Sequence, residues 1–351
     1  MGKWIGGMPL VRRYMRTLVW IAVALAVLGL LMSVAGVVTA EVLRTRPVTL
    51  PEPTGRNAVG RVVYDWIDPS RDDPFAPDEG TKRELLVWVW YPATPGSDSH
   101  PAPYFPPEWA KVREAGAGKL LFQSFGSVRT HSIAGAPLSA AKPSYPVLIM
   151  GPGLGAAAAP DDTVLAEDLA SHGYIVVGYT PTCSTDVTFS DGRVVPSVNA
   201  ARDGAVLDQL LTVWVGDVRF VMDQLVVLNG TASDRFSGRL DLQRIGVFGH
   251  SFGRATALEE CHFDSRCKAA LDIDGSPFGN VIGAGLKQPA MFIIHDGFRP
   301  GCDSCEPDSR GVDAILREST AGGYQVVLKG PQHMNFRDLA MLFAPVMRPL
   351  G

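Results

Sequence analysis

The chain has 351 residues, with 32 Lys+Arg against 36 Asp+Glu and a formal net charge of -4. This near balance argues against nucleic acid as a partner, because binding to a phosphate backbone requires a basic surface. One segment near the N-terminus raises the hydrophobic share to 46%. The remainder has the composition of an ordinary globular domain with an ample core, and the length fits one large α/β domain plus an appendage.

The segment from Leu18 to Ala40 contains no charged residue. As a helix it would span about 34 Å, enough to cross a hydrocarbon core of about 30 Å. Basic residues in the preceding segment, 1–17, favour a cytoplasmic N-terminus. We therefore expect a single-pass transmembrane helix over 18–40 in the cell membrane, with the rest of the chain on the extracytoplasmic side. A signal sequence cleaved near Ala40, which would give a secreted protein, is the alternative because Val38 and Ala40 are small.

Three prolines, Pro47, Pro51 and Pro53, follow the apolar segment. They predict that residues 41–58 form an extended tether and not a packed element.

The segment 59–351 alternates short apolar runs with helical stretches. Continuous apolar runs such as 145–150 are typical of strands that are buried on both faces. The alternation predicts an α/β domain with a mostly parallel, doubly wound sheet. The expected strands are 61–66, 84–91, 145–150, 174–179, 244–248, 268–273, 290–294 and 324–328, of which the first two are antiparallel, and the main helices are 162–172, 200–228 and 253–260.

A Gly-x-Ser-x-Gly motif runs from Gly249 to Gly253, with Ser251 at its centre. It follows an expected strand and opens a helical stretch, which is the setting of a nucleophile elbow in an α/β-hydrolase. Glycines are needed because the sharp turn strains the serine backbone and leaves no room for flanking side chains. We expect Ser251 to be a catalytic nucleophile; a plain Gly-Ser turn is the alternative.

A serine nucleophile requires a base that is itself oriented by an acid, in the chain order Ser, acid, His. His333 follows the last expected strand and is the expected base. Asp274 and Asp296 each end a strand after the nucleophile, and Asp272 is a weaker third candidate. Chain order leaves both Asp274 and Asp296 open as the acid.

The oxyanion hole should combine the backbone N–H of Phe252 with one from the loop after the strand 145–150. In that loop Pro152 has no N–H. Leu154 is therefore the expected donor, with Gly155 second. A phosphate-binding role for this Gly-rich loop is disfavoured, because no Lys-Ser/Thr follows it.

Five cysteines are consistent with an exported domain. We expect two local disulfides, Cys261–Cys267 and Cys302–Cys305, with Cys183 left over. A zinc site made from the four paired cysteines and His262 is an alternative, although its spacing matches no standard site. Free buried cysteines are the remaining possibility.

Four blocks of the sequence resemble the platelet-activating factor acetylhydrolase family, which includes plasma and type II enzymes and bacterial relatives. They cover the chain from about Arg61 to the C-terminus. The blocks are YPVLIMGPGLGA with the downstream DLASHGYIVVGY, then DVRFVMDQL, then GHSFG with RCKAALDIDG, and finally GPQHMNF.

The resemblance implies an α/β-hydrolase fold and a serine esterase acting on short-acyl (acetyl) esters, including phospholipid-like ones, without cofactor, metal or added calcium. The expected partners are an ester substrate and a membrane, which the protein would contact through its N-terminal helix. No nucleic acid partner is expected. The implied site consists of Ser251 as nucleophile, His333 as base, Asp274 rather than Asp296 as acid, and Leu154 and Phe252 as oxyanion donors.

Two positions depart from the family pattern, namely Pro152 and Arg254. Arg254 follows the elbow, and we expect it to restrict the acyl pocket or to bind an anionic group. Only a short connection, 275–288, separates two expected strands, so the site should lack a large cap. A cutinase-like or general carboxylesterase is the alternative enzyme, and a catalytically silent, membrane-anchored binding protein is the alternative from another class.

Overall fold

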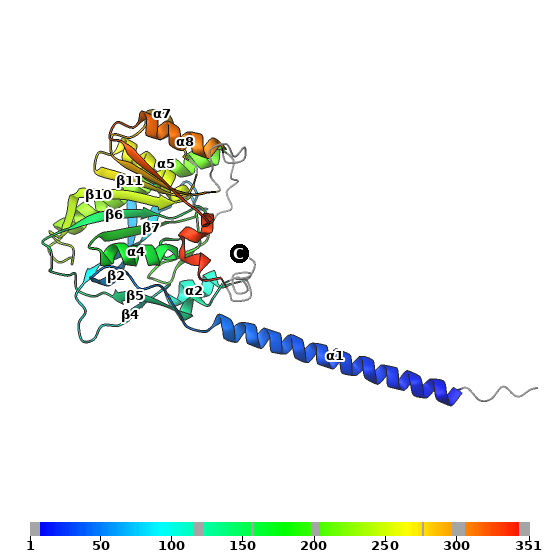
Figure 1. Ribbon diagram of the computed structural model, residues 1–351. Helices are drawn as coiled ribbons and strands as arrows, with labels where there is room; N and C mark the ends of the chain where they lie inside the picture. Colours follow the sequence, from blue (N-terminus) through cyan, green and yellow to red (C-terminus); the bar gives the residue numbers. More distant parts are fainter. Residues whose placement is uncertain are drawn as a thin grey trace, which may run out of the picture.

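The computed structural model describes residues 8–115, 122–155, 158–197, 204–275, 277–296 and 306–343. One large sheet forms its centre, in the order β1-β5-β2-β3-β7-β6-β10-β11-β12-β13, with β4 paired to β5 (Figure 1). Strands β7 to β13 in this order are parallel, whereas β3 is antiparallel to both β2 and β7. The mostly parallel α/β sheet expected from the sequence is therefore confirmed. The strands are β1 (Val48–Thr49), β2 (Ala58–Asp72), β3 (Lys82–Ala93), β4 (Pro101–Pro103), β5 (Val128–Ala134), β6 (Tyr145–Gly151), β7 (Ile175–Pro181), β10 (Leu240–His250), β11 (Cys267–Ile273), β12 (Ala290–His295) and β13 (Gly323–Leu328), and β8 (Val187–Thr188) and β9 (Val194–Val195) form a separate hairpin.

Helices cover both faces of the sheet and create two apolar layers. Along β3, Val87 and Val89 face the layer under α5 and α6, whereas Trp88 and Trp90 face the layer under α4. This alternation follows from the two-residue period of a strand. The helices are α1 (Met8–Arg44), α2 (Pro107–Arg113), α4 (Thr163–Ser171), α5 (Gly204–Gly230), α6 (Phe252–Phe263), α7 (Val281–Ala284) and α8 (Glu306–Glu318), with short 3-10 helices η1 (Phe125–Ser127), η2 (Ala159–Asp162), η3 (His333–Phe336) and η4 (Asp338–Ala340).

The N-terminal helix α1 extends away from the domain (Figure 1). Its part from Arg13 to Arg44 is long and apolar enough to cross a membrane, and its most apolar stretch has no buried side chain. A signal sequence would have the same two properties. The helix continues past Ala40, where the apolar segment ends, as far as Arg44.

The expected unpacked tether over 41–58 is wrong. Strand β1 pairs with β5, and Leu50 is buried in the domain. The backbone N–H of Thr54 donates to Asp168 at 2.7 Å, and that of Gly55 donates to Ser171 Oγ at 2.9 Å. The prolines lack N–H groups, but Thr54 and Gly55, which follow the last of them, use theirs to bind side chains of α4.

A disulfide joins Cys261 at the end of α6 to Cys267 at the start of β11, as expected. Cys183 is buried and is the free cysteine among the described residues. This disulfide removes Cys261 and Cys267 as ligands of the alternative zinc site. The neighbouring His262 has its Nδ1 3.0 Å from the Gly285 carbonyl oxygen. The expected Cys302–Cys305 pair lies outside the described residues.

Candidate active site

Ser251 lies in a tight turn between β10 and α6. Its backbone has φ 56° and ψ −120°, which is a strained conformation for a residue with a side chain. A Cβ atom at Gly249 would overlap the backbone of Gly253, and one at Gly253 would overlap the carbonyl groups of Gly151 and Pro152. Both flanking glycines are therefore sterically required, as the motif predicts. The turn leaves Ser251 partly exposed at the carboxyl edge of the sheet.

Asp274 directly follows β11 and is fully buried, with φ 51°. His333 Nδ1 donates to its Oδ2 at 2.8 Å. On the other side, the backbone N–H of His295 and its ring Nδ1 lie 2.8 and 2.7 Å from Oδ1. Burial acts to raise the pKa of Asp274, but the hydrogen bonds from His333 and His295 outweigh it and hold the pKa below its ordinary value. Two imidazoles thus flank one ionised carboxylate.

Two histidines near this pair had no expected role. His250 lies 4.4 Å from His333 between ring centroids, and its Nε2 is 3.0 Å from the His333 carbonyl oxygen. Because a carbonyl only accepts, His250 Nε2 carries the proton and donates. Burial lowers the pKa of His250 to about 3, so the ring is neutral. His250 therefore holds the backbone of His333, and His295 holds the carboxylate of Asp274; their only signal in the sequence is adjacency to Ser251 and Asp296.

The other candidate acids have different partners. Asp296 continues the backbone ladder to Leu328, and its Oδ1 accepts the N–H of Gly330 at 3.3 Å. Asp272 accepts a hydrogen bond of 2.7 Å from Arg254, and both side chains are fully buried. Arg254 therefore lies beneath the elbow, and the expectation that it narrows the acyl pocket or binds an anion is wrong. The buried carboxylate of Asp272 draws the guanidinium inward.

The expected oxyanion donors come from two elements that touch. Phe252 is the first residue of α6, so its N–H has no acceptor within the helix. The loop after β6, which includes Leu154, passes against Gly253 one residue further along α6. Leu154 itself is partly exposed.

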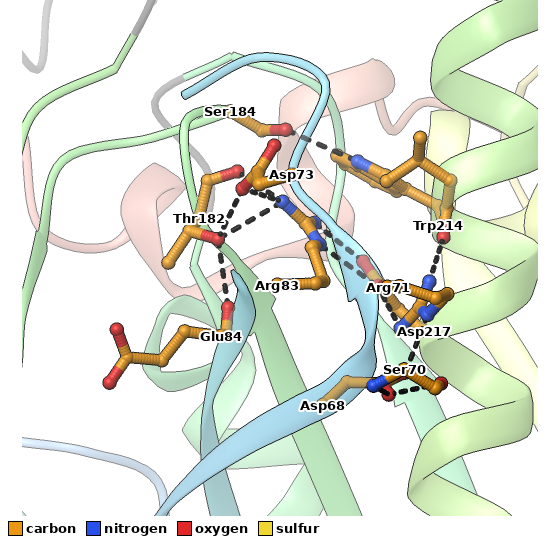
Figure 2. Close-up of polar contacts among 11 residues, drawn as sticks. Asp68, Ser70, Arg71, Asp73, Arg83, Glu84, Thr182, Ser184, Trp214 and Asp217 are labelled. Carbon is orange, nitrogen blue, oxygen red and sulfur yellow. Dashed lines mark hydrogen bonds and ion pairs between the residues drawn. The ribbon is translucent and has the colours of Figure 1, made fainter. Parts of the chain in front are cut away.

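The helix that packs against Phe252, α5, is bound to its neighbours by a buried ionic network. The Trp214 ring of α5 packs edge-on against Phe252, 5.1 Å between centroids, and its Nε1 donates to Ser184 Oγ at 3.1 Å. Figure 2 shows Arg83 of β3 bound to Asp217 on the same helix, at 2.6 and 3.0 Å, and to Asp73 at 2.7 Å. This network ties α5, the β2–β3 hairpin and the loop after β7 together.

The described part of the connection between β11 and β12 contains one short helix, α7. Among the described residues, no cap is inserted at this connection.

A sequence profile described as "Platelet-activating factor acetylhydrolase, isoform II" matches residues 74–180 and 205–349, which is well over half of the chain. The chain belongs to this family. The structure also resembles a ferulic acid esterase from Streptomyces cinnamoneus, with a TM-score of 0.69, 29% identity, and coverage of 86% of this chain and 82% of that one.

Two curated relatives carry names consistent with the family. The platelet-activating factor acetylhydrolase of Cavia porcellus is 27% identical over 250 residues, and a probable 1-alkyl-2-acetylglycerophosphocholine esterase of Arthroderma benhamiae is 26% identical over 262 residues. The matches cover 63% and 70% of this chain, but 54% and 64% of those relatives. The chain thus spans between about half and two thirds of their length.

Proposed function

We propose that the protein is a serine esterase with Ser251 as nucleophile, His333 as base and Asp274 as acid. The observation that carries the proposal is the 2.8 Å hydrogen bond from His333 Nδ1 to buried Asp274, next to a serine held in an elbow. A serine in a strained turn beside an oriented imidazole is the arrangement that acyl transfer needs. The oxyanion donors would be the N–H groups of Phe252 and Leu154.

The first half of the reaction forms an acyl-enzyme. Asp274 fixes the proton of His333 on Nδ1, so Nε2 is free to accept the Ser251 hydroxyl proton as the oxygen attacks the ester carbonyl. The resulting oxyanion would be stabilised by the two backbone donors. His333 then gives the proton to the leaving alcohol, and the C–O bond breaks. In the second half, water attacks the acyl carbonyl while His333 takes its proton. His333 then returns this proton to Ser251 Oγ as the acyl C–O bond breaks, which releases the carboxylic acid and restores the serine hydroxyl.

Short-acyl esters, including phospholipid-like ones, are the substrates we propose. The names of the two relatives support an acetyl ester, and the absence of a cap between β11 and β12 in the described chain supports an open site. A general or cutinase-like carboxylesterase is the second candidate, favoured by the similarity to a ferulic acid esterase.

We further propose that α1 anchors the protein in the cell membrane with the domain on the extracytoplasmic side. The exposed apolar surface of α1 supports this location. Mass spectrometry of the mature N-terminus tests it, since a start at Glu41 would mean cleavage and secretion.

The test of the activity is labelling by a fluorophosphonate together with a rate profile over acyl chains of increasing length, without added calcium. Ser251→Ala should abolish labelling, and Ser251→Ala and His333→Ala should each lower kcat by about 10⁴–10⁶, since triad members act as a unit. The exposed Ser190→Ala and His172→Ala are matched controls that should keep full activity. Near-normal turnover in either active-site variant would refute a serine hydrolase, and a rate maximum at long chains would refute the short-acyl preference.

A further inference from the structure

The last turn of α1 is built into the domain. Arg44 is buried and binds Glu114, at the end of α2, at 2.9 Å, and its carbonyl oxygen accepts the N–H of Ser124 at 2.9 Å. Glu41 binds the same guanidinium at 2.9 and 3.0 Å. Ala40, which ends the charge-free segment, is one helical turn or about 6 Å before Arg44. No flexible linker therefore separates the apolar helix from the domain.

Gln123 connects this junction to the segment that carries His333. Its side-chain Nε2 donates to the carbonyl oxygens of Leu43 and Arg46, at 3.2 and 2.7 Å. Its backbone N–H donates to Leu342 at 2.7 Å, at the end of the segment that begins with His333 in η3. One residue thus binds both the base of α1 and the active-site segment.

A buried ionic network makes the same connection by a second route. Arg113 of α2, next to Glu114, binds Asp161 of η2 at 3.1 Å. Arg337, between η3 and η4, binds the neighbouring Asp162 at 3.0 Å and Asp161 at 3.5 Å. These side chains are nearly or fully buried, and a buried charge keeps its partner because leaving it unpaired is costly.

The two connections place the base of α1 beside the segment that carries His333, and so on the same side of the domain as the surface around Ser251 and His333, which we call the mouth of the site. In Figure 1 the red segment with η3 and η4 lies beside α2, on the side from which α1 leaves. Two apolar side chains of this segment, Met334 and Met341, are 41% and 38% exposed. The segment that carries His333 therefore has exposed apolar side chains and lies on the side of the anchor.

We infer that this rigid junction holds the mouth of the site against the bilayer from which α1 emerges, so that the substrate is an ester residing in that bilayer. The inference about the substrate rests on the proposed esterase function, whereas the orientation does not. A tether would let the domain sample all orientations; a helix continuous with the domain selects one.

The experiment uses the full chain in phosphatidylcholine vesicles and two acetyl esters, hexadecyl acetate in the bilayer and p-nitrophenyl acetate in solution. A Gly-Ser linker of about ten residues, reaching about 17 Å, is inserted between Ala40 and Glu41, which leaves the junction contacts in place. We expect hydrolysis of hexadecyl acetate to fall about tenfold and that of p-nitrophenyl acetate to stay within about twofold. The same insertion after Gly96, in an exposed turn, is the matched control and should change neither rate.

A second measurement reports orientation without activity. A fluorescent amino acid replaces Met341 or, as control, Val227, which lies near the end of α5, close to the amino end of β10, and is 55% exposed. Nitroxide-labelled lipids should quench the probe at 341 but not at 227, and the linker should reduce the difference. Three results would each overturn the inference. They are equal quenching at both positions, a rate of hexadecyl acetate hydrolysis that the linker leaves unchanged, and a mature chain that starts at Glu41. A different result would separate the two proposals. If the unmodified protein does not hydrolyse p-nitrophenyl acetate but the quenching difference is present, the esterase function and the bilayer substrate are refuted, whereas the orientation stands.

Discussion

Asp274→Asn tests the proposed acid most sharply, because the structure fixes how the new amide would lie. The Oδ1 position of Asp274 accepts two donors from His295, its backbone N–H and its ring Nδ1. An amide NH₂ group cannot accept the backbone N–H, so the asparagine oxygen stays on the His295 side and its NH₂ faces His333 Nδ1. His333 must then carry its proton on Nε2 and cannot take the proton of Ser251.

The size of the loss follows from the alternative amide orientation. Flipping the asparagine restores the productive form of His333 but leaves the buried N–H of His295 unpaired, at a cost of about 1–3 kcal/mol. The productive form is then populated at about 0.6–16%. Loss of the negative charge that stabilises the imidazolium supplies the rest, so kcat should fall by about 10³–10⁴, in the range known for a triad acid.

The assay is kcat on p-nitrophenyl acetate, with the fold of each variant checked by circular dichroism. Asp296→Asn is the matched control and should cost about tenfold or less, because Asp296 supports the turn at Gly330. Collapse of activity in the Asp296 variant, with Asp274→Asn still active, would move the acid to the end of β12 and refute the reasoning.

Three further outcomes are expected. Deleting residues 1–43 should give a soluble protein that keeps its soluble-ester activity, whereas deleting 1–57 should lower thermal stability because it also removes buried Leu50; equal melting temperatures of the two truncated proteins would contradict the packing of this segment. Burial raises the pKa of Glu260 from 4.5 to about 7, so the folded state holds more protons than the unfolded state between these values. The free energy of unfolding should therefore fall as pH rises through this window, by up to about 3 kcal/mol, and Glu260→Gln should flatten that dependence in urea titrations. His295→Phe removes one hydrogen-bond donor to Asp274, which should shift the acidic limb of the pH profile of kcat/KM to higher pH. An unchanged pH profile would show that His295 has no influence on the acid.

The fold was largely predictable because buried strands carry their own signal. Apolar runs such as Tyr145–Gly151 and the alternation along β3 follow directly from burial on one or both faces. The tight turn at Ser251 was predictable for a similar reason, since it has a steric requirement that glycines at fixed spacing meet.

The choice between Asp274 and Asp296 could not be made from the residues alone. Both follow a parallel strand of the same sheet, and adjacent strand ends place their side chains at the same edge. Both backbone N–H groups continue the ladder, that of Asp274 to Ile293 and that of Asp296 to Leu328. The difference lies in the φ angle, because Asp274 turns out of β11 with φ 51°. Such a local departure has no residue pattern. The family resemblance favours Asp274, and the Asp-Gly sequence at 296–297, typical of a turn, disfavours Asp296.

The polar contacts between distant segments were not predictable at all. Arg44 and Glu114 are 70 residues apart and follow no periodic pattern. The sequence wrongly suggests that Arg254 faces the acyl pocket, because its position next to the elbow is visible in the sequence. Its partner Asp272 becomes a neighbour only through the packing of α6 on β11.

Buried ion pairs recur beneath the loops that carry the site. Arg254–Asp272 lies under the elbow, Arg337 with Asp162 lies under the His333 segment, and Arg83–Asp217 supports the helix that packs on Phe252. Such pairs add little net stability, because the cost of removing both charges from water offsets their attraction. They do penalise displacement strongly, since a shifted loop would leave a charge buried and unpaired. Their value here is therefore orientational: the apolar layers stabilise the sheet, and the charges fix how the loops at its carboxyl edge lie relative to one another and to α1.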